Sequence, residues 1–435
     1  MESEAKSMNG DEVVISGISG IFPQSNSVLE FGENLYSKVD MVIVNHSFEN
    51  SKIPELPIHM GKISDLEKFD AQFFRVSYWQ VIDIDPLCRK LMEHTFNAIF
   101  DAGVNPVTLA GKRIGVYAGS SFNDHFAKMM DDFNSKNLSV PVGASSAMLA
   151  HRISYWLDSK CPSYTVDFSC VSSSLCLEKA VNDIKLGFID AAIVGGTNAC
   201  NNPILNYNLR KAGLLCLDGK TRCFDKKGDG YVRSEAVTSL FLQRAKDAKR
   251  IYAEICHVKG GYLMRQDAEF LPKREVEDLI NFIQTFYKEV KVSPKDVEYV
   301  EANGSGIVSA DKNELDAIDR VFKSNGSLKI GSVKSNIGHT EAASGICSVI
   351  KMCLAYRSGI IPSNLHYSEP IDNDAIFNNR LKVVVENTLF DRGYTAINNF
   401  SFTGGNFHIL LKGHYKPKAI VLYCTNENMH VDIIF

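Results

Sequence analysis

Apolar runs and amphipathic stretches alternate along most of this chain, with short polar or glycine-rich segments between them. The stretch EVVISGISGIF, residues 12–22, predicts a buried strand that ends in glycines. Residues 190–199, DAAIVGGTNA, have the composition of a strand buried on both faces. Residues 394–413, YTAINNFSFTGGNFHILLKG, predict two strands around a glycine turn. This alternation predicts an α/β fold in which helices pack on largely parallel sheets.

The order strand, polar segment, apolar helix and glycine occurs twice. In the first copy a strand ends at Val166, and a helix with apolar residues at helical spacing (Leu177, Val181, Ile184) is expected to stop at Gly187. The second copy is residues 328–359, LKIGSVKSNIGHTEAASGICSVIKMCLAYRSG. Because the copies lie on either side of about residue 250, the pattern indicates an internal duplication.

Composition narrows the class of protein. The chain has 435 residues, of which 45% are hydrophobic and 23% charged, as in soluble globular proteins. A net charge of -4 provides no basic surface, so nucleic acid is not expected as a partner. The chain contains no run of about 18 uncharged apolar residues, so no membrane span is predicted. Its polar start, MESEAKSMNGDEVV, has no signal-peptide core. We therefore expect a cytoplasmic protein.

The chain's eleven cysteines are scattered and include no C-x-x-C pair, which argues against zinc and against a disulfide framework. One of them, Cys170, stands where the strand pattern of YTVDFSCVSSSLCLEKAVNDIKLG changes to a helical one. Unpaired helix N–H groups at such a join favour a thiolate and can bind an oxyanion. A single cysteine is a buried hydrophobe in roughly three of four cases, so other motifs must support a chemical role.

Three other motifs provide that support. GSVKSNIGHTEAASG places Lys334 and His339 on a glycine-containing loop ahead of a helix, and a histidine at such a join is a candidate catalytic residue. YVEANGSGIVSADKNE places Asn303 at a strand end before glycines. NNFSFTGGNFH places Phe400 and Phe402 beside glycines, which let backbone approach a ligand closely.

Taken together, these stretches resemble the β-ketoacyl synthase (condensing enzyme) family. They are most similar to the ketosynthase domain that begins animal, particularly insect, type I fatty acid synthases. The similarity covers about residues 11 to 412 and includes GKISDLEKFDAQFF, DIDPLCRKLMEHTFNAI, AHRISYWLD, CFDKKGDGYVRSEA and SNLHY in the expected order.

The resemblance implies a thiolase-like α/β fold, built from two duplicated halves in five αβαβα layers. The implied N-terminal half, residues 11–250, carries Cys170, and the C-terminal half, residues 251–412, carries Asn303, Lys334 and His339. Residues 1–10 are expected to be a polar leader and residues 413–435 a ragged tail.

The implied chemistry is decarboxylative condensation in fatty acid or polyketide synthesis. Cys170 would accept an acyl chain from a carrier-protein thioester, and the enolate left when a malonyl thioester loses carbon dioxide would attack it. By resemblance, His339 is the second catalytic histidine. Lys334 and Glu314 would support the histidine site, with Phe400 beside them. The N–H groups of Cys170 and Phe402 would form the oxyanion hole, and Phe402 would gate the acyl pocket. Ser305 and Ile307 would contact the pantetheine arm.

The resemblance also implies partners and cofactors. The partners would be an acyl carrier protein, acyl and malonyl thioesters delivered on phosphopantetheine, and a second copy of the chain in a homodimer. No metal and no bound cofactor is expected, because the carbanion comes from decarboxylation. The chain stops after the ketosynthase segment, so carriers would come from elsewhere, or the sequence is a fragment of a larger synthase.

Asn303 departs from the family, whose pattern E-A-H-G-T-G reads EANGSG here. An asparagine amide donates hydrogen bonds as the family's histidine does, but it is shorter and accepts no proton at neutral pH. Loss of one well-placed oxyanion donor costs roughly 10²–10³ in rate, about 2.7–4 kcal/mol. We therefore expect slow decarboxylation, with acyl transfer less affected.

Smaller departures lie around the same residues. Phe168, Ser169 and Val171 replace small family residues beside Cys170, and the bulk of Phe168 is expected next to the thiol. Ile307 takes a threonine position, Thr403 replaces a glycine and should stiffen its loop, and HVKGGYLMRQDAEFLP has lost most of a family loop. These changes fit a diverging duplicate or a retuned enzyme.

Three functional hypotheses follow. The first is a condensing acyltransferase with an acylated Cys170, which the retention of Cys170, Lys334 and His339 favours. The second is a non-catalytic ketosynthase-like subunit that dimerises or binds acyl carriers, which Asn303 and Phe168 favour. The third is a thioesterase or acyl-transfer activity that stops before carbon–carbon bond formation.

Overall fold

Eleven strands form one continuous mixed sheet, and helices cover both of its faces. The computed structural model describes residues 9–49, 51–121, 143, 145–263, 275–322, 326–416, 424–425 and 428–429. The strand order is β12-β10-β9-β14-β15-β8-β1-β7-β6-β4-β5.

The two halves of the sheet have the same topology. The N-terminal half has the order β5-β4-β6-β7-β1 and is made of β1 (Val13–Ile21), β4 (Ile114–Ser120), β5 (Ser163–Val166), β6 (Ala191–Asn198) and β7 (Ala236–Arg244). The C-terminal half has the order β10-β9-β14-β15-β8 and is made of β8 (Ala253–Tyr262), β9 (Val297–Glu301), β10 (Leu328–Gly331), β14 (Tyr394–Phe400) and β15 (Gly405–Lys412), with β12 (Leu381–Val383) added outside β10. The predicted duplication is confirmed.

Strand directions also match between the halves. In each half three strands run parallel, β5-β4-β6 and β10-β9-β14, and the next two, β7-β1 and β15-β8, are paired antiparallel. The prediction of largely parallel sheets was therefore wrong, since half of these pairings are antiparallel. A strand buried on both faces is apolar whether its neighbours run parallel or antiparallel to it, so composition does not show the relative direction of the strands.

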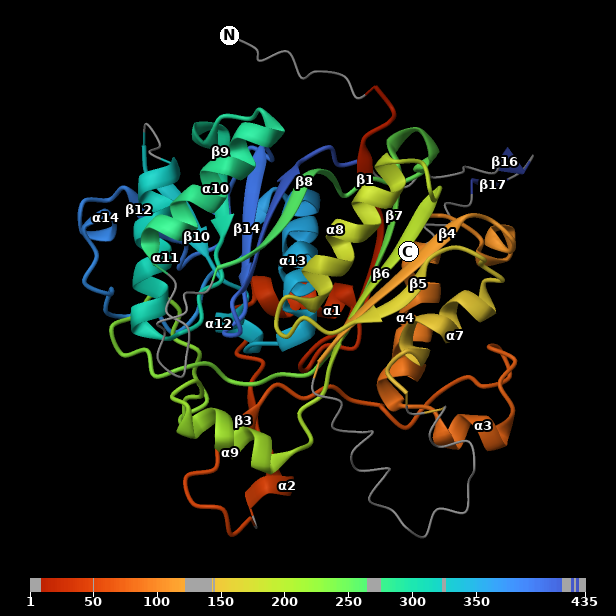
Figure 1. The fold of residues 1–435 in the computed structure, drawn as a ribbon, viewed down its shortest axis with the longest axis horizontal. Helices are drawn as coiled ribbons and strands as arrows, with labels where there is room; N and C mark the ends of the chain where they lie inside the picture. The colour runs from red at the N-terminus through yellow and green to blue at the C-terminus, as the bar shows by residue number, and fades with distance from the viewer. Residues whose placement is uncertain are drawn as a thin grey trace.

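Helices separate the structure into five layers (Figure 1). Two helices, α8 (Ser172–Lys185) and α13 (Ser344–Ser358), lie between the half-sheets. The outer layer of the N-terminal half holds α4 (Pro86–Asp101) and α7 (Met148–Trp156). The outer layer of the C-terminal half holds α10 (Val276–Val290) and α11 (Val308–Phe322). This is the expected αβαβα architecture of the thiolase-like fold.

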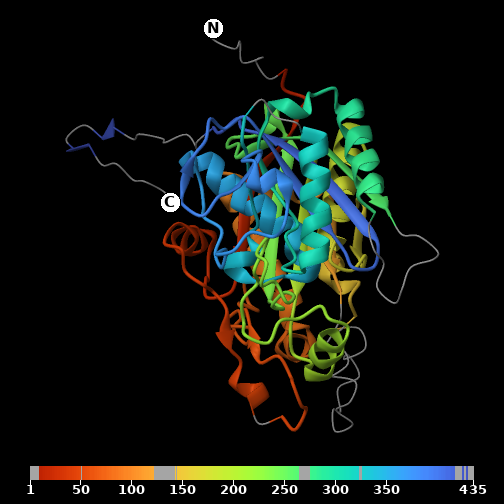
Figure 2. The same cartoon turned by 90° about the vertical axis from the view of Figure 1, so that its left-hand side faces the viewer.

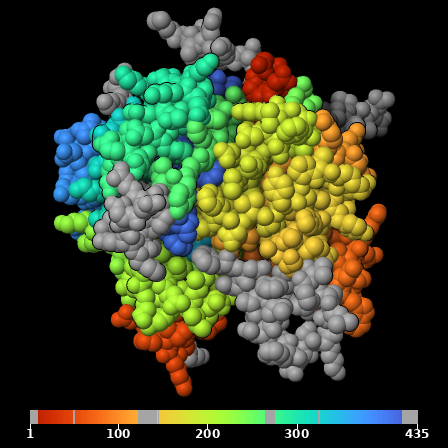
Figure 3. Space-filling model, viewed as in Figure 1, coloured from red at the N-terminus to blue at the C-terminus, as the bar shows by residue number. Residues whose placement is uncertain are grey.

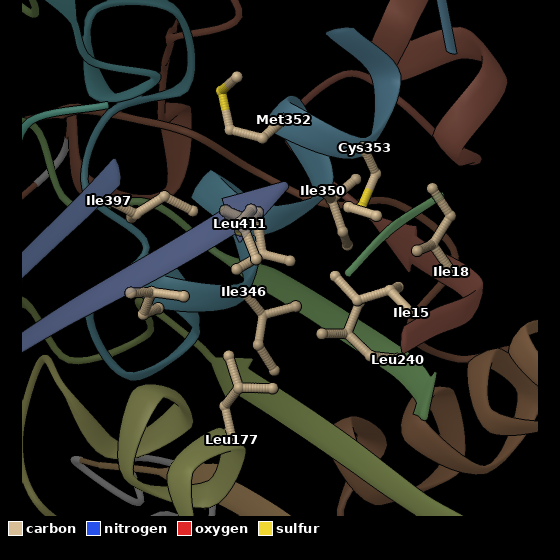
Figure 4. Close-up of a cluster of buried hydrophobic side chains, with 14 of the residues drawn as sticks. Ile15, Ile18, Leu177, Leu240, Ile346, Ile350, Met352, Cys353, Ile397 and Leu411 are labelled. Atoms are coloured by element: carbon tan, nitrogen blue, oxygen red, sulfur yellow. The ribbon is translucent and has the colours of Figure 1, made fainter. Parts of the chain in front are cut away.

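Helix α13 lies deep within the central layer. Helix α13 is buried from Ser344 to Tyr356, as expected for a helix that is apolar around most of its circumference. Figure 4 shows its Ile346 and Ile350 among Leu177 of α8, Leu240 of β7 and the strands of the C-terminal half. Side chains from both halves therefore share one core.

Shorter elements complete the chain. They are α1 (Val28–Tyr36), β2 (Ile43–Val44), α2 (His46–Glu49), β3 (His59–Met60), α3 (Tyr78–Asp83), η1 (Pro106–Leu109), α9 (Pro203–Lys211), η2 (Ala245–Asp247), η3 (Pro294–Asp296), α12 (Lys334–Ile337), η4 (Glu341–Ala343), β11 (Ile360–Ile361), α14 (Asp374–Phe377), β13 (Thr388–Leu389), β16 (Cys424–Thr425) and β17 (Asn428–Met429). Both ribbon views show α2, β3 and α9 below the layers (Figures 1 and 2).

Two sequence expectations concern this periphery. The polar segment before α13, expected as a loop, contains the short helix α12 and the 3-10 turn η4. Most of the predicted tail, 413–435, lies outside the described residues. No helix in the described ranges combines the length and the apolar character needed to cross a bilayer.

Candidate active site

Cys170 lies in the tight turn between β5 and α8. Ser169, immediately before it, has a φ of +54°, a left-handed conformation that is unusual outside glycine. Ser172 holds this turn, because its hydroxyl donates to the Ser169 carbonyl at 2.6 Å and accepts from the Phe168 N–H at 2.8 Å. The sequence pattern therefore placed Cys170 correctly at a strand-to-helix join.

The C-terminal half contacts this turn directly. The Ser344 hydroxyl of α13 donates to the Cys170 carbonyl at 3.0 Å, and Asn399 Nδ2 of β14 donates to the Ser344 oxygen at 2.9 Å. Gly405, at the start of β15, lies so close that a Cβ there would be 2.8 Å from Val171 Cγ2. Both halves of the fold therefore fix the position of the thiol.

Burial keeps the Cys170 sulfur neutral. The residue is 1% exposed, and burial, with a contribution from Glu341, raises its pKa from 9.0 to about 11, although Ser169, Lys334 and Ser401 oppose the change. This difference corresponds to about 2.7 kcal/mol, whereas a helix N-terminus favours a charge by about 0.3–1 kcal/mol. The prediction of an ionised thiol was wrong for the free protein, because desolvation outweighs the helix.

His339 follows Gly338, which has a φ of +74°. Its Nδ1 accepts a hydrogen bond from the Glu341 N–H at 3.1 Å, so the neutral ring carries its proton on Nε2. Burial and the positive charges of Lys334 and Arg233 lower the pKa of His339 well below its usual value. Nε2 has no hydrogen-bond partner among the described residues, and it can donate to a bound substrate.

A buried ion pair behind His339 was not predicted from the sequence. Arg233 Nε and Nη2 each donate to a carboxylate oxygen of Glu341 at 2.8 Å, and Nη1 donates to Asn206 Oδ1 at 2.7 Å. Both charged groups are at most 1% exposed. The pair fixes the residue whose N–H holds the His339 ring. In the sequence, the two residues are charged positions inside the motifs GYVRSEA and GHTEAASG, and these positions could have indicated the pair.

Asn303 follows β9, and its amide orientation is determined by its partners. Its Oδ1 accepts from Lys334 Nζ and from the Phe400 N–H, both at 3.0 Å. Lys334 Nζ also donates to the Asn303 carbonyl at 2.6 Å. Because two donors occupy Oδ1, the NH₂ end of the amide points elsewhere, and it has no acceptor among the described residues.

Lys334 and Glu314 support Asn303 from different sides. Glu314 accepts the Asn303 N–H at 2.8 Å and the Gly304 N–H at 3.0 Å, while Lys334 binds the Asn303 oxygens. Lys334 and Glu314, which the sequence predicts as one supporting network, are therefore linked by their hydrogen bonds to Asn303. Burial lowers the pKa of Lys334 and raises that of Glu314.

The predicted pantetheine contacts lie in the loop after β9. The Ser305 hydroxyl donates to Asp311 Oδ1 at 2.9 Å and accepts from the Ile307 N–H at 3.3 Å, so it is used within the loop. Ile307 and Phe402 pack against one apolar cluster that includes Tyr231. Tyr231 in turn meets the His339 ring edge-on, with 4.8 Å between ring centroids.

Phe402 lies in the turn between β14 and β15. Its N–H has no acceptor among the described residues, whereas the Thr403 N–H donates to the Ser401 hydroxyl at 3.2 Å. Thr403 and Ser401 also join their hydroxyls at 2.8 Å, which supports the expected stiffening of this turn. The ring of Phe168 meets Phe407 edge-on at 6.4 Å between centroids, and it packs on the central core.

The candidate residues all follow the carboxyl ends of parallel strands, in one half of the fold or the other. Asn303, the Lys334–His339 segment and Phe402 follow the neighbouring parallel strands β9, β10 and β14, and Cys170 follows β5. The carboxyl ends of parallel strands are the usual ligand-binding edge of α/β sheets. The arrangement presents a neutral thiol together with N–H donors that can stabilise a developing negative charge on oxygen.

Metal ligands and disulfides do not contribute among the described residues. No group of three or more histidine, cysteine, aspartate or glutamate side chains in those ranges is placed to hold a metal ion. Ten of the chain's eleven cysteines, those from Cys88 to Cys353, are free thiols. Of the altered family loop HVKGGYLMRQDAEFLP, residues 264–272 lie outside the described residues.

Comparison with known proteins gives matches over most of the chain. A family model for the β-ketoacyl synthase N-terminal domain matches residues 10–248, and one for the C-terminal domain matches residues 255–368. Fatty acid synthase of Anser anser anser is 37% identical over 355 residues, which are 80% of this chain and 100% of that sequence. The highly reducing polyketide synthase sor1 of Hypocrea jecorina (strain QM6a) is 33% identical over 80% of this chain, which spans 14% of that synthase.

Solved structures give the same result. The oxazolomycin ketosynthase domain OzmH KS7 of Streptomyces albus JA3453 has a TM-score of 0.86 and 26% identity, covering 95% of this chain and 77% of that one. The ketosynthase from module 6 of the bacillaene synthase of Bacillus subtilis 168 has a TM-score of 0.85 and 27% identity, covering 95% of this chain and 74% of that one.

The pKa of Cys170 can be tested by alkylation. Because iodoacetamide reacts with the thiolate, the rate at Cys170 should rise about tenfold per pH unit from pH 7 to pH 10, without levelling off. Peptide mass spectrometry would follow the modification. The urea-unfolded chain is the reference and should level off above its ordinary value of 9.0. A folded-state rate that is constant above pH 8 would contradict a buried, neutral thiol.

Proposed function

The chain belongs to the β-ketoacyl synthase family, the condensing enzymes of fatty acid and polyketide synthesis, and we propose that it condenses acyl and malonyl thioesters through an acyl-Cys170 intermediate. The observation that carries this proposal is the Asn303 amide, whose oxygen is held by Lys334 and the Phe400 N–H, which leaves its N–H donors for a substrate.

The first step transfers an acyl group to the sulfur of Cys170. Its thiol attacks the carbonyl of a carrier thioester, a new carbon–sulfur bond forms, and the bond to the carrier sulfur breaks. The thiol proton goes to the departing carrier sulfur, so the group leaves as a thiol. The N–H groups of Cys170 and Phe402 would stabilise the oxyanion, since nothing described accepts the Phe402 N–H.

The second step forms the carbon–carbon bond. A malonyl thioester loses carbon dioxide, and the electron pair of the broken bond moves onto the thioester oxygen. His339 Nε2–H and Asn303 Nδ2–H would both donate to that oxygen as its charge develops. The enolate carbon then attacks the acyl carbonyl and expels the Cys170 sulfur, which regains a proton. The product is a 3-ketoacyl thioester.

Asn303 keeps a donor but shortens the side chain. Oδ1 accepts hydrogen bonds from Lys334 Nζ and the Phe400 N–H. Nδ2 would donate to the substrate from a position closer to the backbone than that of a histidine Nε2. We therefore propose a decarboxylation step slower than in relatives that keep histidine here. The same weakness favours, as a second candidate, acyl transfer to Cys170 that stops before condensation.

The partners follow from this chemistry. Substrates would arrive as phosphopantetheine thioesters on an acyl carrier protein, and no bound cofactor is needed because decarboxylation supplies the carbanion. The free thiols of the described cysteines support a reducing, cytoplasmic setting. A homodimer would form at β5, the last strand of the sheet, where the segment holding α7, β5 and α8 (yellow in Figure 3) lies open on the viewed face.

Acylation of Cys170 tests the enzymatic proposal. After incubation with an acyl-carrier or acyl-CoA thioester, intact-mass measurement should show one acyl group per chain, located on Cys170 by peptide analysis. Cys170→Ala should show none. No adduct on the wild type, or an equal adduct on the Cys170→Ala variant, would leave the non-catalytic subunit as the better hypothesis.

Carbon dioxide release from a malonyl thioester tests the role of Asn303. Asn303→His should raise the rate by roughly tenfold to a thousandfold, because it restores a longer donor to the enolate oxygen. Asn303→Asp, of the same size but without N–H donors, should lower it. An unchanged rate in Asn303→His would show that this position does not limit decarboxylation.

Light scattering during size-exclusion chromatography tests the dimer. We expect twice the mass of one chain at micromolar concentration, because the edge strand β5 offers unpaired backbone groups to a second copy. A single-chain mass across a hundredfold range of loading would contradict the proposed dimer.

A further inference from the structure

A chain of buried polar side chains runs from helix α10 to the loop that carries Asn303. Tyr287 of α10 lies 3.3 Å from His408 Nε2, and His408 Nδ1 lies 2.7 Å from Asn398 Oδ1. Asn398 Nδ2 donates to Glu314 Oε1 at 2.8 Å. Glu314 then accepts the N–H groups of Asn303 and Gly304.

The direction of every hydrogen bond in this chain is determined. Both Glu314 oxygens already accept a backbone N–H group, so the NH₂ end of Asn398 faces this side chain. Asn398 therefore turns its oxygen to His408, which must carry its proton on Nδ1. His408 Nε2 is then the acceptor for the Tyr287 hydroxyl. All four side chains are buried.

The surroundings keep this arrangement fixed. His408 is packed edge-on against Phe286, with 4.6 Å between ring centroids. Burial lowers the pKa of His408 to about 3, so the ring is neutral through the physiological range. Asn398 and His408 are also direct partners in the β14–β15 pairing, which sets their separation.

We propose that His408, with Asn398, is a positioning residue for the Asn303 donor, acting through Glu314. The proposal rests on the function proposed above. Without the His408 donor, the buried Asn398 Oδ1 is left unpaired, which costs free energy and favours a shift of the amide toward another donor. Glu314 would then lose one of its three donors and hold the Asn303 and Gly304 N–H groups less firmly.

Asn303 is sensitive to such a loss because its donor is close to the backbone. A shift of the main chain at residue 303 moves the amide by about the same amount, and a misplacement of about 1 Å can cost on the order of a hundredfold in rate. Cys170 and its turn are held by other contacts, through Ser172 and Ser344. The chain of side chains should therefore affect decarboxylation and not acylation.

The experiment compares four variants with the wild type. His408→Phe removes both ring nitrogens, while His408→Asn keeps a donor at the Nδ1 position. Tyr287→Phe removes only the longer, terminal hydrogen bond. His257→Phe is the matched control, because His257 packs on the same Phe286 ring at 4.8 Å but is not part of the chain.

Four quantities should separate these variants. His408→Phe should lower the turnover number for carbon dioxide release by about tenfold to a hundredfold, with KM and Cys170 acylation within about twofold of wild type. His408→Asn should recover most of the rate, and the other two variants should stay near wild type. Hydrogen exchange in a peptide covering residues 302–307 should be about tenfold faster in His408→Phe, with residues 114–120 unchanged.

The outcomes distinguish the two proposals. Absence of wild-type acylation would end the proposed function, but the exchange measurement would still test the positioning role. Unchanged exchange at residues 302–307 in His408→Phe would overturn that role. So would acylation and decarboxylation that fall together with the unfolding temperature, or a His408→Asn variant as impaired as His408→Phe.

Discussion

The hydrogen bonds between the buried Lys334 ammonium and Asn303 are the interaction on which the site depends. A buried ammonium is costly unless acceptors surround it, and the Asn303 carbonyl and Oδ1 supply two of them. The same bonds determine which end of the amide faces the substrate. Glu314 completes the arrangement by holding the Asn303 N–H. Lys334 and Glu314 thus fix the position and orientation of Asn303 from opposite sides through hydrogen bonds.

Burial moves the reactive groups toward their neutral forms. It raises the pKa of the Cys170 thiol and lowers the pKa values of His339 and Lys334. This is the expected effect of desolvation, which disfavours any charged form. The site therefore acts mainly through fixed hydrogen-bond donors, and an asparagine can take one of these positions without providing a base. The buried Arg233–Glu341 pair contributes differently, because its two hydrogen bonds of 2.8 Å fix the residue whose N–H orients the His339 ring.

Much of the fold was predictable because local pattern and tertiary burial agree. The apolar runs of β1 and β6 are fully buried strands, and the helical spacing after Cys170 gives α8 with Gly187 just beyond its end. Strand direction was not predictable, since it depends on connections. The pKa of Cys170 and the partner of Arg233 were not predictable either, because both depend on residues brought together from distant segments, such as Glu341.

The hydrogen bond between Ser344 and Cys170 joins residues 174 positions apart in the chain. During synthesis the ribosome adds about 5–20 residues per second, so roughly ten to thirty seconds separate the emergence of the two residues. Throughout that interval α8 has no α13 to pack against, and the Cys170 carbonyl has no Ser344 hydroxyl to donate to it. The turn that carries the sulfur is thus completed only when the second half of the chain has been made.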